Sequence, residues 1–216
     1  MNVKKYILLS LSAFVIAGSL NGCRTVKRAS ASADVNGQSA LEESSLSANK
    51  ETDFFCESNN SGLTVMGYLG ADTVVVIPEQ IDGQNVTIIG MNAFKGNSAI
   101  TSVTIPETVT LVGENAFSGC VSLTEAVLPE TLECIDIGAF SDCTSLAEIT
   151  VPRSVRYILN DAFLNCTSLE CITVLNPDLA YENWGIDNLP NVVIKADSAS
   201  AVGVWAGEMG KFSALE

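Results

Sequence analysis

The sequence predicts a solenoid, a fold in which each coil repeats the structure of the coil before it. An Ala-Phe pair returns every 23 residues, at Ala93-Phe94, Ala116-Phe117, Ala139-Phe140 and Ala162-Phe163. The residues between these pairs repeat as well. A unit of this length cannot bury its apolar side alone, but stacked units bury one another. We therefore expect a β-rich molecule with short turn or helical segments and about 23 residues per coil.

The repeat also predicts where each coil forms a strand. Leu146, Ile149 and Val151 represent an apolar run that recurs in every unit, and its last two members lie on one face of a strand. Pro106, Pro129 and Pro152 follow the run in three units. Proline has no N–H to continue a ladder, so we expect each strand to end there.

Both ends of the array depart from the repeat, as terminal coils of solenoids do. Upstream, Asp53 to Cys56 and Leu63 to Tyr68 predict a β-hairpin that caps the first coil. A five-residue insertion around Asp82-Gly83-Gln84 separates that cap from the regular units. Downstream, Gly185-Ile186 predicts a degenerate fifth coil, and Asn191 to Ala196 predicts one more strand.

The last residues predict a C-terminal strand and helix cap. Val202, Trp205, Met209 and Phe212 follow helical spacing, although Gly203, Gly207 and Gly210 weaken a helix.

The unit from Ser122 to Cys143 resembles the BspA-type leucine-rich repeat of bacterial surface proteins, and Gly67-Tyr68-Leu69-Gly70 resembles the first unit of that family. The resemblance covers about Phe54 to Ile194 and implies a leucine-rich-repeat solenoid. Members of this family are generally exported or surface-exposed, and several resemble adhesins that bind host matrix proteins or other cells, so the resemblance also implies an exported binding protein. The departures are Asn97 in place of a cysteine, Asp136 and Leu159 where Gly90 and Gly113 stand, and no proline after Val174.

The N-terminal segment is typical of an export signal. Lys4 and Lys5 precede an apolar run, and the order of basic, apolar and small residues predicts a secretory signal. Leu20-Asn21-Gly22-Cys23 resembles the lipobox of bacterial lipoproteins, which implies lipidation of Cys23. An ordinary cleaved signal that ends near a cysteine is the alternative. Residues 24–50 are rich in Ser and Ala and contain no aromatic residue, which predicts a flexible tether.

These observations divide the chain into five parts. They are a lipoprotein signal peptide (1–22), a tether (23–50), the capping hairpin and first coil (51–92), the leucine-rich repeats (93–190) and a C-terminal cap (191–216).

The charge of the chain disfavours some classes of partner. Residues 51–216 contain 5 basic and 22 acidic residues, a formal charge of −17. Such a surface repels phosphate backbones and anionic lipid, so we expect no nucleic-acid partner and membrane contact only through Cys23. Cationic partners are favoured.

The residue types argue against catalysis, and no cofactor is predicted. The chain has no histidine, which excludes Ser-His-Asp and Cys-His catalysis and imidazole metal sites. Cys120, Cys143 and Cys166 share one inward position of the repeat, so we interpret them as an apolar ladder of free thiols and not as a zinc site. An even number of cysteines in an exported protein also permits disulfides. Cys171 falls at a solvent-facing position and is predicted to be the most reactive.

The outward residues of the repeated strand and of its approach predict one contiguous polar face, which is where solenoids usually present a binding surface. They are Thr101, Ser102, Thr104, Thr124, Glu125, Val127, Ala147, Glu148, Thr150, Glu170 and Thr173. For any single residue, a plain solvated side chain is the competing interpretation. The leading hypothesis is a non-enzymatic, lipid-anchored protein of the cell surface or outer membrane that binds a protein partner.

The sequence is also compatible with two other functions. The first is binding of envelope carbohydrate, which the absence of an aromatic side chain on the face disfavours. The second is a glycan-acting enzyme that uses surface carboxylates, since paired carboxylates catalyse glycoside hydrolysis.

Overall fold

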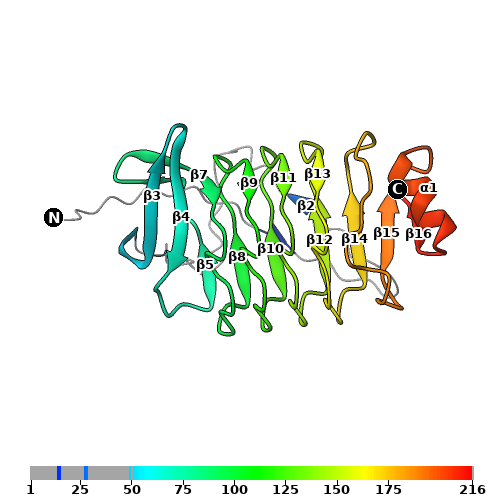
Figure 1. The fold of residues 1–216 in the computed structure, drawn as a ribbon, viewed down its shortest axis with the longest axis horizontal. Helices are drawn as coiled ribbons and strands as arrows, with labels where there is room; N and C mark the ends of the chain where they lie inside the picture. Colours follow the sequence, from blue (N-terminus) through cyan, green and yellow to red (C-terminus); the bar gives the residue numbers. More distant parts are fainter. Residues whose placement is uncertain (1–13, 16–26, 29–48, 50, 216) are drawn as a thin grey trace, which may run out of the picture.

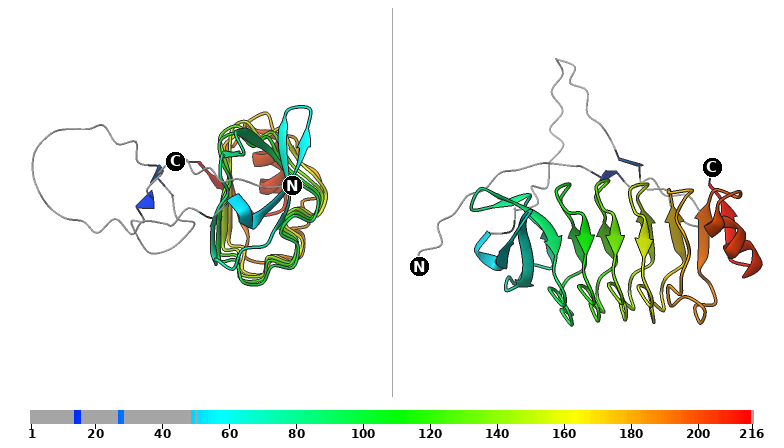
Figure 2. Two further views of the ribbon diagram at one scale, coloured as in Figure 1. Left: turned by 90° about the vertical axis from the view of Figure 1, so that its left-hand side faces the viewer. Right: turned by 45° about the horizontal axis from the view of Figure 1, so that its top comes forward.

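The computed structural model describes residues 14–15, 27–28, 49 and 51–215. Residues 51–215 form a stack of coils with a β-hairpin at one end and a helix at the other (Figure 1). Viewed along the stack, successive coils superpose on one another (Figure 2). The predicted leucine-rich-repeat solenoid is therefore confirmed.

Each regular coil contributes a strand to each of two sheets. The strands of sheet 1 are β5 (Val74–Val76), β8 (Ser102–Thr104), β10 (Glu125–Val127), β12 (Glu148–Val151), β14 (Cys171–Val174), β15 (Val193–Ala196) and β16 (Phe212–Ala214). The strands of sheet 2 are β3 (Phe54–Asn59), β4 (Gly62–Tyr68), β7 (Gln84–Ile89), β9 (Leu111–Val112), β11 (Cys134–Ile135) and β13 (Tyr157–Ile158).

Except between β10 and β12, the strands of neighbouring regular coils pair in parallel and in the register of the repeat. On sheet 1, Ser102 stands beside Glu125, 23 residues later. On sheet 2, Ile135 stands between Val112 and Ile158. Sheet 1 consists of two hydrogen-bonded groups, β5–β8–β10 and β12–β14–β15–β16, which follow one another along the stack (Figure 1). Residues at equivalent positions therefore form straight columns along the molecule.

The Ala-Phe pairs form the centre of the core. Phe94, Phe117, Phe140 and Phe163 are buried, and their rings stack at centroid distances of 4.8, 5.3 and 6.1 Å. Tyr68 extends this column into the cap, 5.7 Å from Phe94. Ala116, Ala139 and Ala162 are fully buried beside the rings. The predicted inward ladder is confirmed.

Two turns in each coil require a left-handed backbone. The first turn has positive φ at the residue before Ala-Phe, and the second has it two residues after Phe. Asn, Asp and Gly tolerate this region better than other residues. The residues are Asn92, Asn115, Gly138 and Asp161 at the first turn, and Gly96, Gly119, Asp142 and Asn165 at the second.

The N-terminal cap has the predicted hairpin. Strands β3 and β4 pair antiparallel, and β4 pairs with β7 of the first coil. The insertion is a second hairpin, in which β6 (Gln80–Ile81) pairs with β7 across the turn at Asp82-Gly83. Asn49 is buried against this end, where its side-chain amide donates to the Asp72 carboxylate at 2.8 Å. A short 3-10 helix (Glu51–Asp53) leads into β3.

The C-terminal cap contains the expected strand β15 and helix α1 (Ala201–Glu208). Ser200 caps α1, since its hydroxyl accepts a hydrogen bond from the Gly203 N–H at 2.9 Å. The extension of the helical spacing to Phe212 was wrong, because Phe212 begins β16. Gly210, at φ +68°, ends the helix as glycine does after a C-cap.

The fifth coil is degenerate, as expected. After β14, residues 175–192 contain no strand, so sheet 2 ends at β13. Ile186 is buried, but Trp184 takes the place that alanine holds in earlier coils: its carbonyl accepts from the Phe163 N–H at 2.9 Å. The loop of this coil therefore runs past β13 without pairing with it.

The other described residues form β1 (Phe14–Val15) and β2 (Lys27–Arg28), which pair antiparallel. Within the described part of the chain, no helix has the length and apolar character needed to cross a bilayer.

Candidate functional site

The structure places the eleven predicted face residues together on sheet 1. All of them lie on β8, β10, β12 and β14 or one residue before these strands, and each is exposed or half-buried. They alternate with the buried residues Val103, Ala126, Ile149 and Ile172. Ser102 aligns with Glu125, Thr104 with Val127, and Thr150 with Thr173. The predicted residues therefore form one ordered surface.

Part of this face has a structural role. The Thr124 hydroxyl donates to the Thr101 carbonyl at 2.9 Å, and the Thr101 hydroxyl donates to the Thr73 carbonyl at 3.1 Å. These bonds join consecutive coils. The Ser102 hydroxyl donates to the Glu125 carboxylate at 3.2 Å, also between coils. The part of the surface on β8 and β10 is consequently held together by its own polar side chains.

The cysteine column is a structural ladder, as predicted. Cys120, Cys143 and Cys166 are fully buried free thiols. Each thiol donates to a carbonyl of the preceding coil, at Phe94, Phe117 and Phe140, over 3.2, 3.2 and 3.1 Å. Among the described residues, no group of three or more His, Cys, Asp or Glu side chains is arranged to hold a metal ion.

Burial suppresses the reactivity of these thiols. Burial raises the pKa of Cys120 and of Cys166 to about 12, and that of Cys143 further still. A thiol must lose its proton to act as a nucleophile or a metal ligand. The column therefore stays protonated at neutral pH.

The prediction that Cys171 is solvent-facing was wrong. Its side chain is 1% exposed and it is disulfide-bonded. The period-two pattern of the strand places Cys171 on the outer face of the sheet, but a sequence pattern does not show whether other residues cover that face. Cys56 and Cys134 are instead the half-buried free cysteines. Burial, together with Asp82, raises the pKa of Cys56 to about 11.

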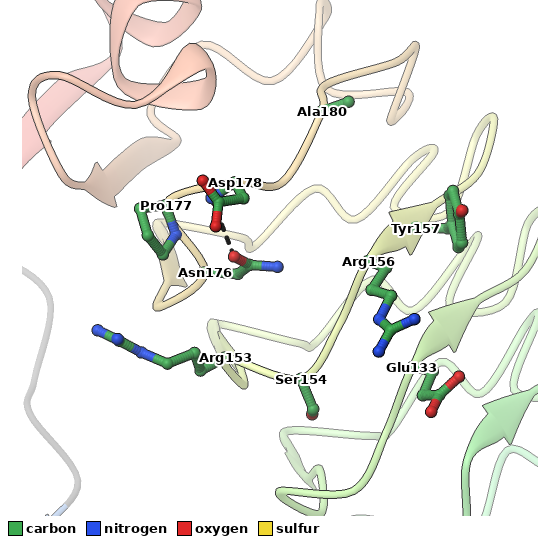
Figure 3. Close-up of a pocket in the computed structure, with 9 residues that line it drawn as sticks. All are labelled: Glu133, Arg153, Ser154, Arg156, Tyr157, Asn176, Pro177, Asp178 and Ala180. Atoms are coloured by element: carbon green, nitrogen blue, oxygen red, sulfur yellow. Dashed lines mark hydrogen bonds between the residues drawn. The ribbon is translucent and has the colours of Figure 1, made fainter.

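A second feature lies outside the face and was not predicted. A groove of about 610 Å³ opens beside β13, where the degenerate coil passes without pairing. Arg153, Arg156 and Tyr157 line one side of it, and Asn176 and Asp178 line the other (Figure 3). The Ser154 hydroxyl at this site is buried and has no hydrogen-bond partner. The signal was present in the sequence, because Arg153 and Arg156 replace the Glu130 and Glu133 of the coil before.

Comparison with known proteins agrees with this geometry. Residues 76–181 match the model of the BspA-type leucine-rich repeat region, in six copies. The T. pallidum leucine-rich repeat protein (TpLRR) has 31% sequence identity over 69% of this chain and 71% of its own, with a TM-score of 0.65. The chain belongs to the BspA-type leucine-rich-repeat family. No curated protein matches it.

Two other solved structures share the repeat. A leucine-rich repeat protein from Bacteroides capillosus is 33% identical over 56% of this chain and 94% of its own, with a TM-score of 0.52. A leucine-rich cell surface protein from Faecalibacterium prausnitzii is 26% identical over 66% of this chain, with a TM-score of 0.54. This chain spans 38% of that longer protein.

The buried thiols predict a loss of stability in alkali. Folding raises the pKa of Cys143. The contribution of this thiol to the free energy of unfolding is therefore complete below the unfolded-state pKa of about 8.5, and it is lost as the pH rises toward the folded-state pKa. Between pH 9 and 11, each such thiol should lower the free energy of unfolding by about 1.4 kcal/mol per pH unit. Urea unfolding at several pH values measures this slope.

Cys143→Ala should reduce that slope by the contribution of one thiol, about 1.4 kcal/mol per pH unit. Cys134→Ala serves as the control and should change it less, since Cys134 is only half-buried. An unchanged slope in Cys143→Ala would show that the thiol is not desolvated as described.

Proposed function

We propose that this protein is a non-enzymatic, lipid-anchored protein of the bacterial cell surface that binds a protein partner through the outward face of sheet 1. The proposal rests on the eleven accessible residues that lie in order on, or one residue before, the four successive strands β8, β10, β12 and β14. Solenoids commonly use such repeated surfaces for binding. The relationship to a leucine-rich cell surface protein supports an exported location.

The rigidity of the face supports a binding role. Its strands pair in parallel within two groups, β8 with β10 and β12 with β14. Hydrogen bonds from Thr101, Ser102 and Thr124 connect the coils of the first group. A preorganised surface loses little conformational freedom on binding, so more of the contact energy appears as affinity. The face residues therefore need no rearrangement before they meet a partner.

The charge of the face suggests the kind of partner. Glu125, Glu148 and Glu170 contribute carboxylates, and residues 51–216 carry a formal charge of −17. A partner with a basic surface would be attracted and oriented by this field. A catalytic role has less support, since Glu125 is exposed on an open strand surface, whereas ligand and substrate sites are usually concave.

The anchor in this proposal is a lipid on Cys23, which lies outside the described residues. A lipidated Cys23 cannot form a disulfide, so the proposal requires that Cys171 is not paired with Cys23. Cleavage before Cys23 would leave residues 24–50 as a tether between the membrane and the repeats. Several acyl chains on one cysteine would hold the protein firmly, whereas a single chain binds only marginally.

Charge reversal on the face tests the binding site. The full-length protein is first screened against an array of host, matrix and bacterial proteins. For the partner found, Glu125→Lys/Glu170→Lys should weaken binding at least about tenfold, because the variant replaces attraction by repulsion. Surface plasmon resonance measures the dissociation constants.

Glu130→Lys/Glu182→Lys provides the matched control, since these exposed carboxylates lie outside the face. It should stay within about twofold of the wild type, by the additivity expected of distant sites. The proposal fails if no protein on the array binds, or if the two double variants weaken binding equally.

The anchor is tested on cells of the native host. The wild-type protein should incorporate radiolabelled palmitate, remain with the membrane fraction and be cut by protease added to intact cells. Cys23→Ala should incorporate no label and leave the membrane. Mass spectrometry of the N-terminal peptide identifies the group on Cys23, and an unmodified or disulfide-bonded Cys23 would contradict the lipid anchor.

A further inference from the structure

The groove beside β13 gathers chemistry that no other coil of the repeat carries. Three columns of the solenoid change character there. The residue after the proline is Glu107, then Glu130, then Arg153. The second column is Thr110, then Glu133, then Arg156. The third column is Leu111, then Cys134, then Tyr157. One coil therefore introduces two arginines and a tyrosine at once.

The two arginines are unusual in a molecule whose charge is strongly negative. Residues 51–216 contain only five basic residues, and two of them line this groove. Carboxylates are abundant, yet no hydrogen bond joins either guanidinium group to the other residues drawn in Figure 3. Arg156 extends toward Glu133, while Arg153 lies on the other side of Ser154 (Figure 3). Two cations thus remain available at separate parts of one groove.

The groove itself results from the break in the repeat. Sheet 2 ends at β13, and the next coil crosses as a loop. That loop is fixed by Asn176, whose amide donates to the Val155 carbonyl at 2.7 Å and whose oxygen accepts from the Asp178 N–H at 2.9 Å. The wall of the groove opposite the arginines is therefore held in place by hydrogen bonds. The volume of about 610 Å³ is within the range of small-ligand sites.

We propose that this groove binds an acidic oligosaccharide, a short chain of sugars that carry carboxylate groups. Guanidinium groups form paired hydrogen bonds with carboxylates. The ring of Tyr157 is 58% exposed beside Arg156 and offers an apolar surface for a sugar ring. Glu133 and Asp178 stand in the same groove as acceptors for sugar hydroxyl groups.

An acidic peptide fits this site less well. A run of acidic side chains would satisfy the arginines but would bring no hydroxyl donors to Glu133 and Asp178. The acidic surface outside the groove also repels any long polyanion, so the site favours a chain of a few sugar units. The groove residues are distinct from the face on sheet 1, and the site does not depend on the protein partner proposed there.

Calorimetric titration of the full-length protein tests the proposal. The probes are tetrasaccharides of galacturonate, of mannuronate and of hyaluronan, with a neutral maltotetraose and a tetraglutamate peptide for comparison. At least one acidic tetrasaccharide should bind, and the neutral sugar should bind at least tenfold more weakly. Arg153→Glu/Arg156→Glu should weaken binding of the acidic sugar at least tenfold, since charge-assisted hydrogen bonds are lost.

The variants are chosen to keep the fold. Arg153→Glu/Arg156→Glu and Tyr157→Leu each install residues that neighbouring coils already use at the same positions. Tyr157→Leu should weaken binding several-fold. Lys95→Glu, at an exposed lysine of the first coil, should leave binding within twofold. Thermal unfolding of each variant verifies that it is folded.

Three outcomes would overturn the inference. The first is that none of the three acidic tetrasaccharides binds. The second is that tetraglutamate binds more tightly than every acidic sugar, which would assign the groove to an acidic peptide. The third is that Arg153→Glu/Arg156→Glu binds an acidic sugar as tightly as Lys95→Glu does.

Discussion

The stacking of identical side chains between coils is the interaction on which the rest of this structure depends. Phe117 and Phe140 lie fully buried with their rings 5.3 Å apart, and the same contact recurs from coil to coil. A single coil has no interior of its own, so each one is stable only because its neighbours cover it. The ladder of aromatic rings therefore sets both the stability and the register of the molecule.

That register determines what every other column does. The inward column at Cys120, Cys143 and Cys166 becomes packing, because each thiol is enclosed and bonded to the coil before it. The outward columns become an accessible surface on sheet 1. Where the fifth coil leaves the register, sheet 2 stops at β13 and a groove with two arginines appears. Regular coils thus build the surface, and the irregular coil builds the concavity.

Much of this arrangement could be predicted from the sequence, because residues 23 apart in the repeat occupy equivalent positions in successive coils. Ala139-Phe140 lies inward for the same reason in every coil, and the terminal hairpin follows from local alternation. Cys171 and Phe212 were misplaced because periodicity describes one element and does not show what covers it or where a glycine ends it. The groove could not be predicted from the repeat, because it lies where residues depart from the repeat. Arg153 and Arg156 are informative because they differ from their columns.

The free energy of unfolding of Phe140→Ala tests the central claim most directly. Phe140 is fully buried between two rings, so its truncation should cost about 3–5 kcal/mol, as for other buried aromatics. Phe55→Ala, at a ring that is 54% exposed, should cost less than about 1 kcal/mol by the same reasoning. Urea unfolding of both variants provides the comparison. Equal losses for the two would contradict the account, because the ladder would then contribute no more than an exposed ring does.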